Sequence, residues 1–574
     1  MHAFPSPCLT LLSLLILSLA VLLYPTGPTS VLSSVSSLVQ LRTCPHSLSE
    51  SVSPHSPSWG TWFHPQRLRQ QPGQSTTKQR PGWNLLYHLG GNGPWVQRAD
   101  PALTTSAAAE IAPPDGCTVD QVHLMSRHAE RYPTRSAGGR HLALLTRIKA
   151  TNTTVNGSLS FLNDWTYFTD DPSRDFEQLT TTGPYAGTLE AFTTGVRFRT
   201  RYAHLLPKGA KTRFWASDSA RVIDTARYFA SGLFGLDWET KGKAELEIIP
   251  ETLERHTDTL TPGDTCLRYI EDTAKGHDYG VNMLTLFQDV YLPAIAHRLV
   301  HEQGNHAIGN FSNVEVYSMQ EMCGFETIAR GSSPWCDVFI VEDWEHFEYA
   351  RDLIHYYRAG PGNPYAGAMG WLWLNATANL LQRGPEAGTM FFSFVHDGDI
   401  APMLTALNIF PDPKYDPHLP VTHIATDRVW RMSTVLPMGG RLSFERLTCG
   451  KWPETEPSSQ TSNFVRININ DGVVPLPDCH SGPGGSCPLE QFVERVRKRR
   501  EEVGDFAEVC GVACLQRAEA ARLFQEALFS YVETAIGILG VDEVAIFSFQ
   551  TSREQRDLGV EIPQKNSDEI PFAD

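Results

Sequence analysis

Arg127, His128 and Arg131 place a histidine between two arginines, and Pro133 follows them. The segment comes after a short run with apolar residues at positions 119, 122, 124 and 125, so His128 stands where a strand is expected to end. Four fixed positions of about one in twenty each would match by chance in roughly one of several hundred such chains. An imidazole nucleophile held between guanidinium groups is suited to attack on an anion.

Two further expected strand ends carry residues of the same kind. Residues 391–395 are a continuous apolar run typical of a strand buried on both faces, and His396 and Asp397 follow it. A helix is expected over residues 399–407. Residues 212–216 lead in the same way to Arg221, in the first turn of a helix that a preceding Ser or Asp can cap.

Three strand-to-helix units of this type predict an open α/β sheet whose ligand crevice lies at the carboxyl edge. The helix N-termini add positive potential there. Phosphoryl transfer needs positioning and charge neutralisation, and planar guanidinium groups match phosphate oxygens in pairs. Because three arginines supply the positive charge, no metal and no other cofactor is expected.

The chain resembles the histidine acid phosphatases, and specifically their secreted fungal acid phosphatase and phytase branch. The likeness covers about 400 residues. Besides the residues above, it rests on Cys479 with Cys487 and on four segments: Trp-Asn-Leu-Leu-Tyr-His-Leu-Gly-Gly-Asn-Gly-Pro at 83–94, Leu-Asn-Asp-Trp-Thr-Tyr at 162–167, Gly-Pro-Tyr-Ala-Gly at 183–187 and Pro-Met-Gly-Gly at 437–440.

The resemblance implies an α/β fold, a histidine-phosphatase-like α/β sandwich domain with an inserted helical cap domain. Residues 82–510 provide enough chain for it, with the cap drawn mainly from residues 138–210 and 251–349 and walling the substrate cleft. His128 would attack phosphorus to form a phosphohistidine, and Asp397 would protonate the leaving oxygen. The residues implied to bind the phosphate are Arg127, Arg131, Arg221 and His396.

The same cluster predicts an acid pH optimum. Neighbouring guanidinium charges disfavour the imidazolium form, so His128 can stay a neutral nucleophile in acid. They also lower the pKa of Asp397, whereas a proton donor must keep its proton. A bound phosphate would partly cancel their field.

Two positions depart from the family pattern. Ala129 stands where the family usually has glycine, and a methyl group there weakens phosphate binding if the backbone needs positive φ. Asp399 ends a His-Asp-Gly-Asp segment where the family commonly has Asn, which adds a carboxylate near an anion site. Ala129 and an unusual C-terminal tail motivate a second hypothesis, a catalytically weakened cell-wall or binding glycoprotein that keeps the fold.

The expected substrates are small phosphate monoesters. Asp120 and Asp343 match acidic rim positions of the branch, and the net charge of −16 makes electrostatic steering of a polyanion poor above the carboxylate pKa values. We therefore expect a broad acid phosphomonoesterase that also acts on phytate. A phosphoglycerate-mutase-like activity uses the same chemistry, but the secretion signals and the donor beside His396 favour hydrolysis.

Other partners are limited by charge and by the leader. The basic run 497–500 lies beside Glu501 and Glu502, so a solvated helix face is preferred over nucleic-acid binding. Membrane contact is expected only if the leader stays uncleaved. The oligomeric state is left open, a homo-oligomer included.

The two ends of the chain differ from its middle. Residues 9–23 form an apolar stretch of signal-peptide length, so residues 1–25 are interpreted as a signal peptide or signal anchor. Residues 26–81 are rich in Ser, Pro and Gln and are expected to be a low-complexity linker or propeptide. The resemblance fades in the C-terminal tail, residues 511–574.

Eleven cysteines indicate an oxidising compartment. Cys479 and Cys487 close a short Gly- and Pro-rich loop and are expected to pair, and the resemblance implies a bond between Cys117 and Cys449. The protein is expected to be secreted or associated with the cell wall. Glycosylation acceptors agree with this and lie at Asn152, Asn156, Asn310 and Asn375. The cysteines left to pair by elimination are Cys266, Cys323, Cys336, Cys510 and Cys514.

Overall fold

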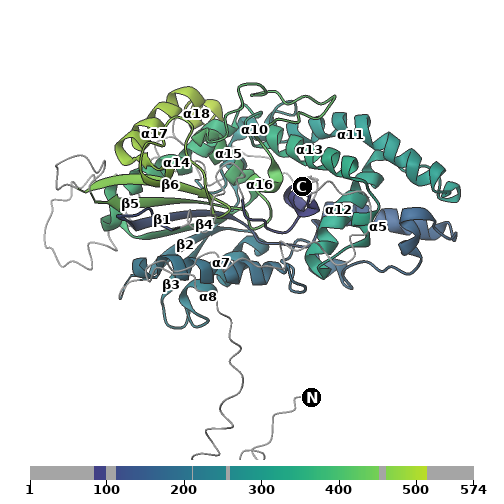
Figure 1. The fold of residues 1–574 in the computed structure, drawn as a ribbon, viewed down its shortest axis with the longest axis horizontal. Coiled ribbons are helices and arrows are strands. Elements are labelled where there is room, and N and C mark those ends of the chain that lie inside the picture. Colours follow the sequence, from purple (N-terminus) through teal and green to yellow (C-terminus); the bar gives the residue numbers. More distant parts are fainter. Residues whose placement is uncertain are drawn as a thin grey trace, which may run out of the picture. The chain divides into compact units, whose positions relative to one another are not determined.

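Four parallel strands form one half of a mixed sheet in the computed structural model (Figure 1). The structure describes residues 83–98, 112–207, 209, 211–253, 259–450 and 461–512. The parallel strands lie in the order β3, β2, β4, β1, and all end at the same edge. Their bounds are β1 Cys117–Arg127, β2 Thr212–Ser217, β3 Ala244–Ile249 and β4 Met390–Val395.

The three strands expected from apolar runs are β1, β2 and β4. Every residue of β4 is buried, which agrees with its uninterrupted apolar sequence. α8 (Ala220–Phe234) follows β2 with Ser219 at its N-cap, and α15 (Asp397–Leu407) follows β4. All three predicted strand-to-helix turns therefore open at one edge of the sheet.

The other half of the sheet is antiparallel and continues from β1. β5 pairs with β1, β6 pairs with β5, and the short strands β7 and β8 both pair with β6. The predicted disulfide Cys117–Cys449 joins the start of β1 to the end of β5, and Cys479–Cys487 is also present. The strands are β5 Arg441–Cys449, β6 Ser462–Ile469, β7 Gly472–Val473 and β8 Cys487–Pro488.

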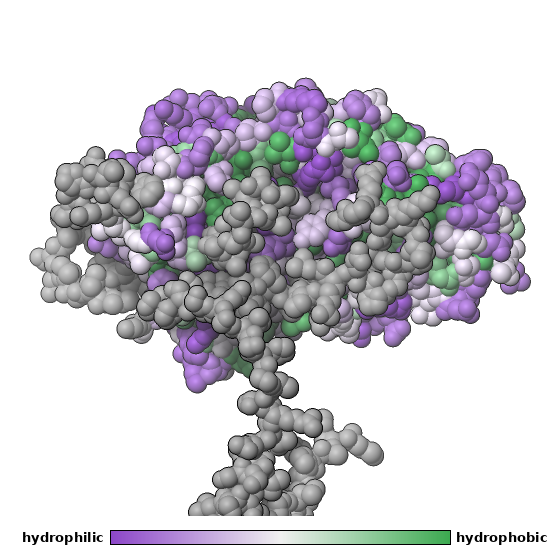
Figure 2. Space-filling view, viewed as in Figure 1, coloured by the Kyte–Doolittle hydropathy of each residue, from purple (hydrophilic) through white to green (hydrophobic). Residues whose placement is uncertain are grey.

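Helices cover both faces of the sheet, as expected for an α/β fold. α7 (Gly187–Tyr202) and α8 lie together below the sheet in Figure 1. α14 (Ala366–Arg383), α15 and α17 (Leu489–Val503) lie above it. α17 carries the basic run, whose Arg497 pairs with Glu494 and Glu501. The surface there is hydrophilic (Figure 2), which supports the solvated-face interpretation.

A second group of helices lies to the right of the sheet in Figure 1, where the parallel strands end. Within it, α11 packs against α12 and α13, and α12 packs against α5. α7 lies within residues 138–210, which were expected to supply part of the cap. It packs instead on α8 at the sheet, because small residues let the two helices touch. The bounds are α5 Arg135–Ala150, α11 Tyr279–His297, α12 Asn313–Arg330 and α13 Val341–Arg358.

Two further disulfides complete the described cysteines. Cys323–Cys336 joins α12 to the turn after it, and Cys266–Cys510 joins residues 244 positions apart. Cys514, the leader, the linker and the tail beyond residue 512 lie outside the described residues. None of the helices in the described ranges is long and apolar enough to cross a membrane. The shorter α-helices are α6 Pro172–Asp175, α9 Pro262–Thr265, α10 Leu267–Glu271, α16 Met432–Val435 and α18 Phe506–Val509.

Candidate active site

The end of β1 holds His128 between two other chain segments. The His128 N–H donates to the carbonyl oxygen of Val395 at 3.0 Å, which extends the β1–β4 pairing by one residue. His396 follows Val395, and the ring centroids of His128 and His396 are 5.6 Å apart. The strand pairing therefore brings together two histidines that are far apart in the sequence.

The hydrogen bond of the His128 ring fixes its tautomer. Nδ1 lies 2.9 Å from the carbonyl oxygen of Ala129, and a carbonyl only accepts, so Nδ1 carries the proton. Nε2 then keeps its lone pair. Burial lowers the pKa of His128 well below its usual value, and the charges of Arg127, Arg221, Arg131 and His396 lower it further. The His128 ring is therefore neutral at acid pH, as expected.

The guanidinium group of Arg127 is built into the floor of the site. It is 2 % exposed and donates to the carbonyl oxygens of Leu436 at 2.9 Å and Gly91 at 3.2 Å. Its Nη2 lies 3.0 Å from Asp397 Oδ2. A Cβ at Gly91 would lie 2.9 Å from Arg127 Nη1, so a larger residue there would displace the guanidinium group. The turn that contains Gly91 therefore helps to position Arg127.

Arg131 and Arg221 approach His128 from other segments. Arg131 is buried, donates to the carbonyl oxygen of Tyr132 at 2.9 Å and lies over the ring of Phe325. Arg221 lies in the first turn of α8. Both guanidinium charges lower the pKa of His128. The structure thus brings together all six residues implied to bind or transfer phosphate.

Asp397 is an anion in this structure. Burial alone would raise its pKa, but Arg127, His355 and Arg358 together hold it well below the usual value. Its Oδ1 accepts the N–H of Gly398 at 2.8 Å. A proton donor must carry its proton, so Asp397 can act as one only after a ligand has neutralised part of the surrounding positive charge.

Sequence reasoning missed Glu251, His355 and Arg358. Glu251 lies just after β3, and its Oε1 is 3.0 Å from His396 Nε2. Burial would raise its pKa, but His396, Ser217 and Arg221 lower it. The rule that found the other strand ends could have found Glu251. His355 and Arg358 lie on α13, far from any strand end in the sequence.

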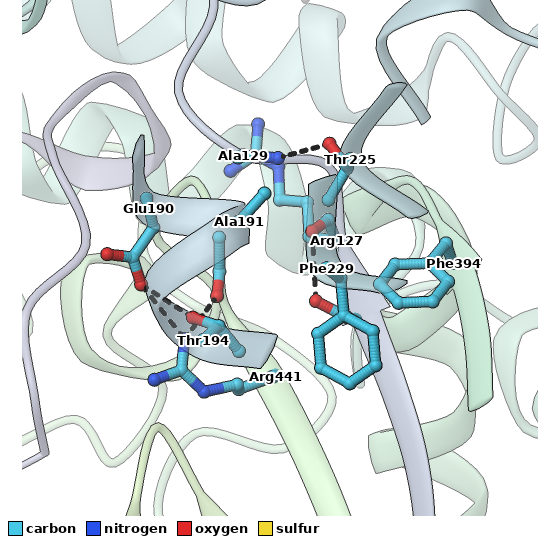
Figure 3. Close-up of a pocket in the computed structure, with 11 residues that line it drawn as sticks. Arg127, Ala129, Glu190, Ala191, Thr194, Thr225, Phe229, Phe394 and Arg441 are labelled. Atoms are coloured by element: carbon cyan, nitrogen blue, oxygen red, sulfur yellow. Dashed lines mark hydrogen bonds and ion pairs between the residues drawn. The ribbon is translucent and has the colours of Figure 1, made fainter. Parts of the chain in front are cut away.

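Ala129 sits in ordinary backbone geometry. It is not among the described residues with positive φ, and it packs with Leu179 and Ala191. Its N–H donates to Thr225 Oγ1 at 3.0 Å (Figure 3). That hydroxyl donates to the carbonyl oxygen of Arg221. A small cavity of about 10 Å³ lies behind it. The methyl group is therefore accommodated without backbone strain.

Asp399 is buried and held neutral. Burial raises its pKa well above the usual value, and the nearby carboxylates Asp264, Glu251 and Asp397 raise it further. Its Oδ2 accepts the N–H of His396 at 2.9 Å. Asp399 therefore does not add the negative charge that the sequence suggested.

The two expected rim residues each form an ion pair within the fold, and their place at a substrate rim stays a prediction. Asp120 is near the start of β1 and pairs with Arg446. Seven residues separate it from Arg127, which is about 23 Å along a strand. Asp343 caps the N-terminus of α13 and pairs with Arg298, about 18 Å along the helix from His355. Both carboxylates serve the fold.

Comparisons with known proteins agree with this architecture. Residues 118–470 match the family model of the histidine phosphatase superfamily, branch 2. Phytase PHO112 of Candida albicans is 35% identical over 444 residues, covering 77% of this chain and 89% of that protein. Acid phosphatase PHO1 of Komagataella pastoris is 35% identical over 438 residues, covering 75% and 87%.

A solved structure gives the same result. The crystal structure of the phytase from D. castellii superposes with a TM-score of 0.67 at 30% sequence identity, covering 77% of this chain and 90% of that one. A family match over more than half the chain and relatives aligned over most of their own length leave one assignment. The chain belongs to branch 2 of the histidine phosphatase superfamily.

Proposed function

We propose that the protein is an acid phosphomonoesterase that hydrolyses small phosphate monoesters through a phosphohistidine at His128. The observation that carries the proposal is the lone pair of His128 Nε2, which stays available in acid among three arginines because the ring proton is held on Nδ1. Relatives named as acid phosphatases and phytases support the same reaction class.

In the first step Nε2 of His128 forms a bond to phosphorus while the bond from phosphorus to the ester oxygen breaks. Arg127, Arg131 and Arg221 neutralise the phosphoryl oxygens, which is the main catalytic requirement of this reaction. Asp397 gives its proton to the leaving oxygen. In the second step the oxygen of a water molecule forms a bond to phosphorus while the bond from phosphorus to Nε2 breaks, which frees His128 and releases phosphate. The Asp397 carboxylate takes the proton that the water loses.

The pH dependence follows from these roles. The free enzyme holds Asp397 as an anion. A bound phosphate dianion opposes the arginine charges, so it raises the pKa of Asp397 and lets it take up a proton. Since the donor form of the enzyme–substrate complex is lost as pH rises through that pKa, kcat falls on the alkaline side. The pKa of His128 is lowered, so its neutral form persists on the acid side. We therefore expect an optimum below neutrality, and a peak above pH 7 would contradict the mechanism.

We propose a broad substrate range that includes phytate. One relative is named a phytase and another an acid phosphatase, at the same identity of 35%. Asp120 and Asp343 argue less strongly against a polyanion, because each pairs with an arginine that compensates its charge. The net charge of −16 still weakens long-range attraction of phytate at neutral pH.

Secretion or cell-wall association is part of the proposal. Four disulfides in the described residues fit an oxidising compartment. Three of the four glycosylation acceptors, Asn152, Asn156 and Asn310, are exposed. Localising the full chain in a cell that exports it tests this directly, and retention in the cytosol would contradict it.

The test of the activity is phosphate release from an aryl phosphate and from phytate across the acid range. The protein, its His128→Ala variant and a His306→Ala control are compared, since His306 is exposed on a surface turn. Activity of the protein and the control, but not of His128→Ala, supports the mechanism. The ratio of the rate on the aryl phosphate to the rate on phytate decides whether the protein is mainly a general phosphatase or a phytase. No release by any of the three would reject the catalytic proposal and favour a binding glycoprotein.

A further inference from the structure

A second histidine, His355, lies behind the expected proton donor. Its Nδ1 is 3.5 Å from Asp397 Oδ2, the same oxygen that pairs with Arg127 at 3.0 Å. The His355 side chain is 5% exposed, so water does not replace this contact easily. The separation is within ion-pair range but longer than a full hydrogen bond, as is common for catalytic groups before substrate binds.

Arg351 decides which His355 nitrogen carries the proton. Arg351 Nη2 lies 3.0 Å from His355 Nε2, and a guanidinium group only donates, so Nε2 must accept. The proton of the neutral ring is then on Nδ1, the ring nitrogen that lies 3.5 Å from Asp397 Oδ2. Burial lowers the pKa of His355 to about 3, so the ring is neutral over most of the acid range.

Arg351 is itself anchored. Its Nη1 donates to Tyr317 on α12 at 3.3 Å, and the charge of Glu321 on the same helix acts on it. Glu321 is in turn held by Arg140 on α5 at 2.9 Å. A buried chain of contacts therefore runs from the helices beyond the sheet to the Asp397 carboxyl group.

We propose that His355 is a positioning residue that holds the Asp397 carboxyl group for proton transfer to poor leaving groups, with Arg351 fixing its tautomer. The proposal rests on the proposed function. It explains why a buried histidine with a defined tautomer lies on α13 against a residue that follows β4.

In each step His355 acts on the Asp397 carboxyl group and not on the phosphate. When the phosphorus–oxygen bond of an alkyl ester breaks, the leaving alkoxide takes the Asp397 proton and departs as an alcohol. The new carboxylate then accepts hydrogen bonds from His355 Nδ1–H and from Arg127. An activated phenol leaves as a stable phenolate and needs no proton, so the position of Asp397 matters little for it.

The charges that face His355 come from three elements. They are Arg127 on β1, Asp397 at the start of α15, and Arg351 with Arg358 on α13 itself. The His355 N–H is one of the groups that lower the pKa of Asp397. Its removal should raise that pKa, so the acid form of Asp397 should persist to higher pH. The alkaline limb of kcat then moves upward.

The test compares the full chain with His355→Leu and His355→Asn on 4-nitrophenyl phosphate and on glycerol phosphate. We expect His355→Leu to lose about tenfold in kcat/KM on the alkyl ester and little on the aryl ester, with the alkaline limb of kcat shifted upward. The amide nitrogen of Asn can occupy the place of Nδ1. His355→Asn should therefore keep most of the native preference between the two substrates.

A His123→Phe variant is the matched control. His123 is also a buried histidine, but it stacks on Phe391 with ring centroids 4.3 Å apart, and burial is the cause of its lowered pKa. In this variant the ratio of kcat/KM on the alkyl ester to kcat/KM on the aryl ester should be unchanged.

An equal loss on both substrates, no loss on either, or an Asn variant that behaves like Leu would overturn the role of His355 while leaving the phosphatase intact. An unmodified protein inactive on both esters would overturn the proposed function and this proposal with it.

Discussion

Two groups of arginines meet near the end of β1, and they differ in how their charge is balanced. One is the active-site group of Arg127, Arg131 and Arg221 around His128. The other is an ion-pair cluster made of Arg197, Glu190, Arg441 and Asp471. They are adjacent, since Arg441 on β5 pairs in register with Ser126, the residue before Arg127.

The ion-pair cluster compensates its own charge. Arg441 lies 2.6 Å from Asp471 and 3.2 Å from Glu190, and Arg197 approaches both carboxylates within 4 Å. Burial opposes the charged forms, yet the pKa of Arg441 is raised and that of Asp471 is lowered. Both partners therefore hold their charge.

In the active-site group the neighbouring charges instead favour the neutral form of a side chain. His128 is pushed toward its neutral form by every charge that acts on it. The positive potential there is left for a ligand to neutralise. Side chains of the same type thus stabilise the fold where opposite charges match and form an anion site where the positive charge is in excess.

The largest expected effect separates the two groups most sharply. His128→Ala should lower kcat by about ten-thousand-fold or more, because no other side chain can replace the nucleophile. Its free energy of unfolding should change little. Steady-state phosphate release and urea denaturation measure the two quantities. A variant with substantial activity would mean that the phosphate is attacked by another group.

Asp471→Asn should act on the fold instead. Removing Asp471 leaves two arginines, Arg197 and Arg441, against the single carboxylate of Glu190. One buried positive charge is then uncompensated, at a cost of about 3–5 kcal/mol in the free energy of unfolding. Urea denaturation at neutral pH is the measurement. The control is Asp478→Asn, because Asp478 forms an exposed ion pair with Arg495 and should contribute less than about 1 kcal/mol. Equal losses in both variants would remove the distinction between the groups.

The same variant has a pH signature. The pKa of Asp471 is lower in the folded chain than in the unfolded one. Its contribution is therefore complete above the unfolded value, about 3.9, and is lost as pH falls toward the folded value. The stability difference between the native chain and Asp471→Asn should shrink on acidification below about pH 4.

Arg221→Ala should give a smaller loss that is confined to activity. A charge-assisted hydrogen bond is worth roughly 1.5–3 kcal/mol, so kcat/KM should fall by about ten- to a hundredfold. Arg227→Ala is the matched control, since Arg227 lies on the same helix and is exposed. If both variants lose activity equally, α8 contributes its fold rather than a phosphate ligand.

The smallest effect is expected at Ala129, which lies between the two groups. Its φ is not positive, and its methyl group packs in place, so Ala129→Gly should change kcat/KM by less than about twofold. Initial rates on an aryl phosphate are sufficient for this comparison. A large gain in rate would instead favour the hypothesis of a weakened enzyme.

Much of the site could be predicted from the sequence because its residues follow strand ends. Arg127 and His396 stand at the ends of segments whose apolar pattern identifies a strand. Arg221 stands in the first turn of the helix that follows such a segment. Parallel strands end at a common edge, so local patterns were enough to bring these side chains together.

The rest depends on distances that local patterns do not contain. Asp120 and Asp343 were assigned to a rim by resemblance, and no local pattern shows that each pairs with an arginine. His355 reaches Asp397 because of how α13 packs beyond the sheet. The Cys266–Cys510 bond likewise joins segments that no motif connects.

Asp399 shows that an aspartate in the sequence does not always add a negative charge to a site. A carboxyl group that keeps its proton offers one acceptor and one donor, much as an amide does, and the genetic code separates Asp from Asn by a single base. Because its pKa is raised on folding, any penalty is absent below the unfolded value and grows as pH rises toward the folded value. A lineage living in acid could therefore exchange the two residues by mutation without selection detecting the change, whereas a move to neutral surroundings would expose it.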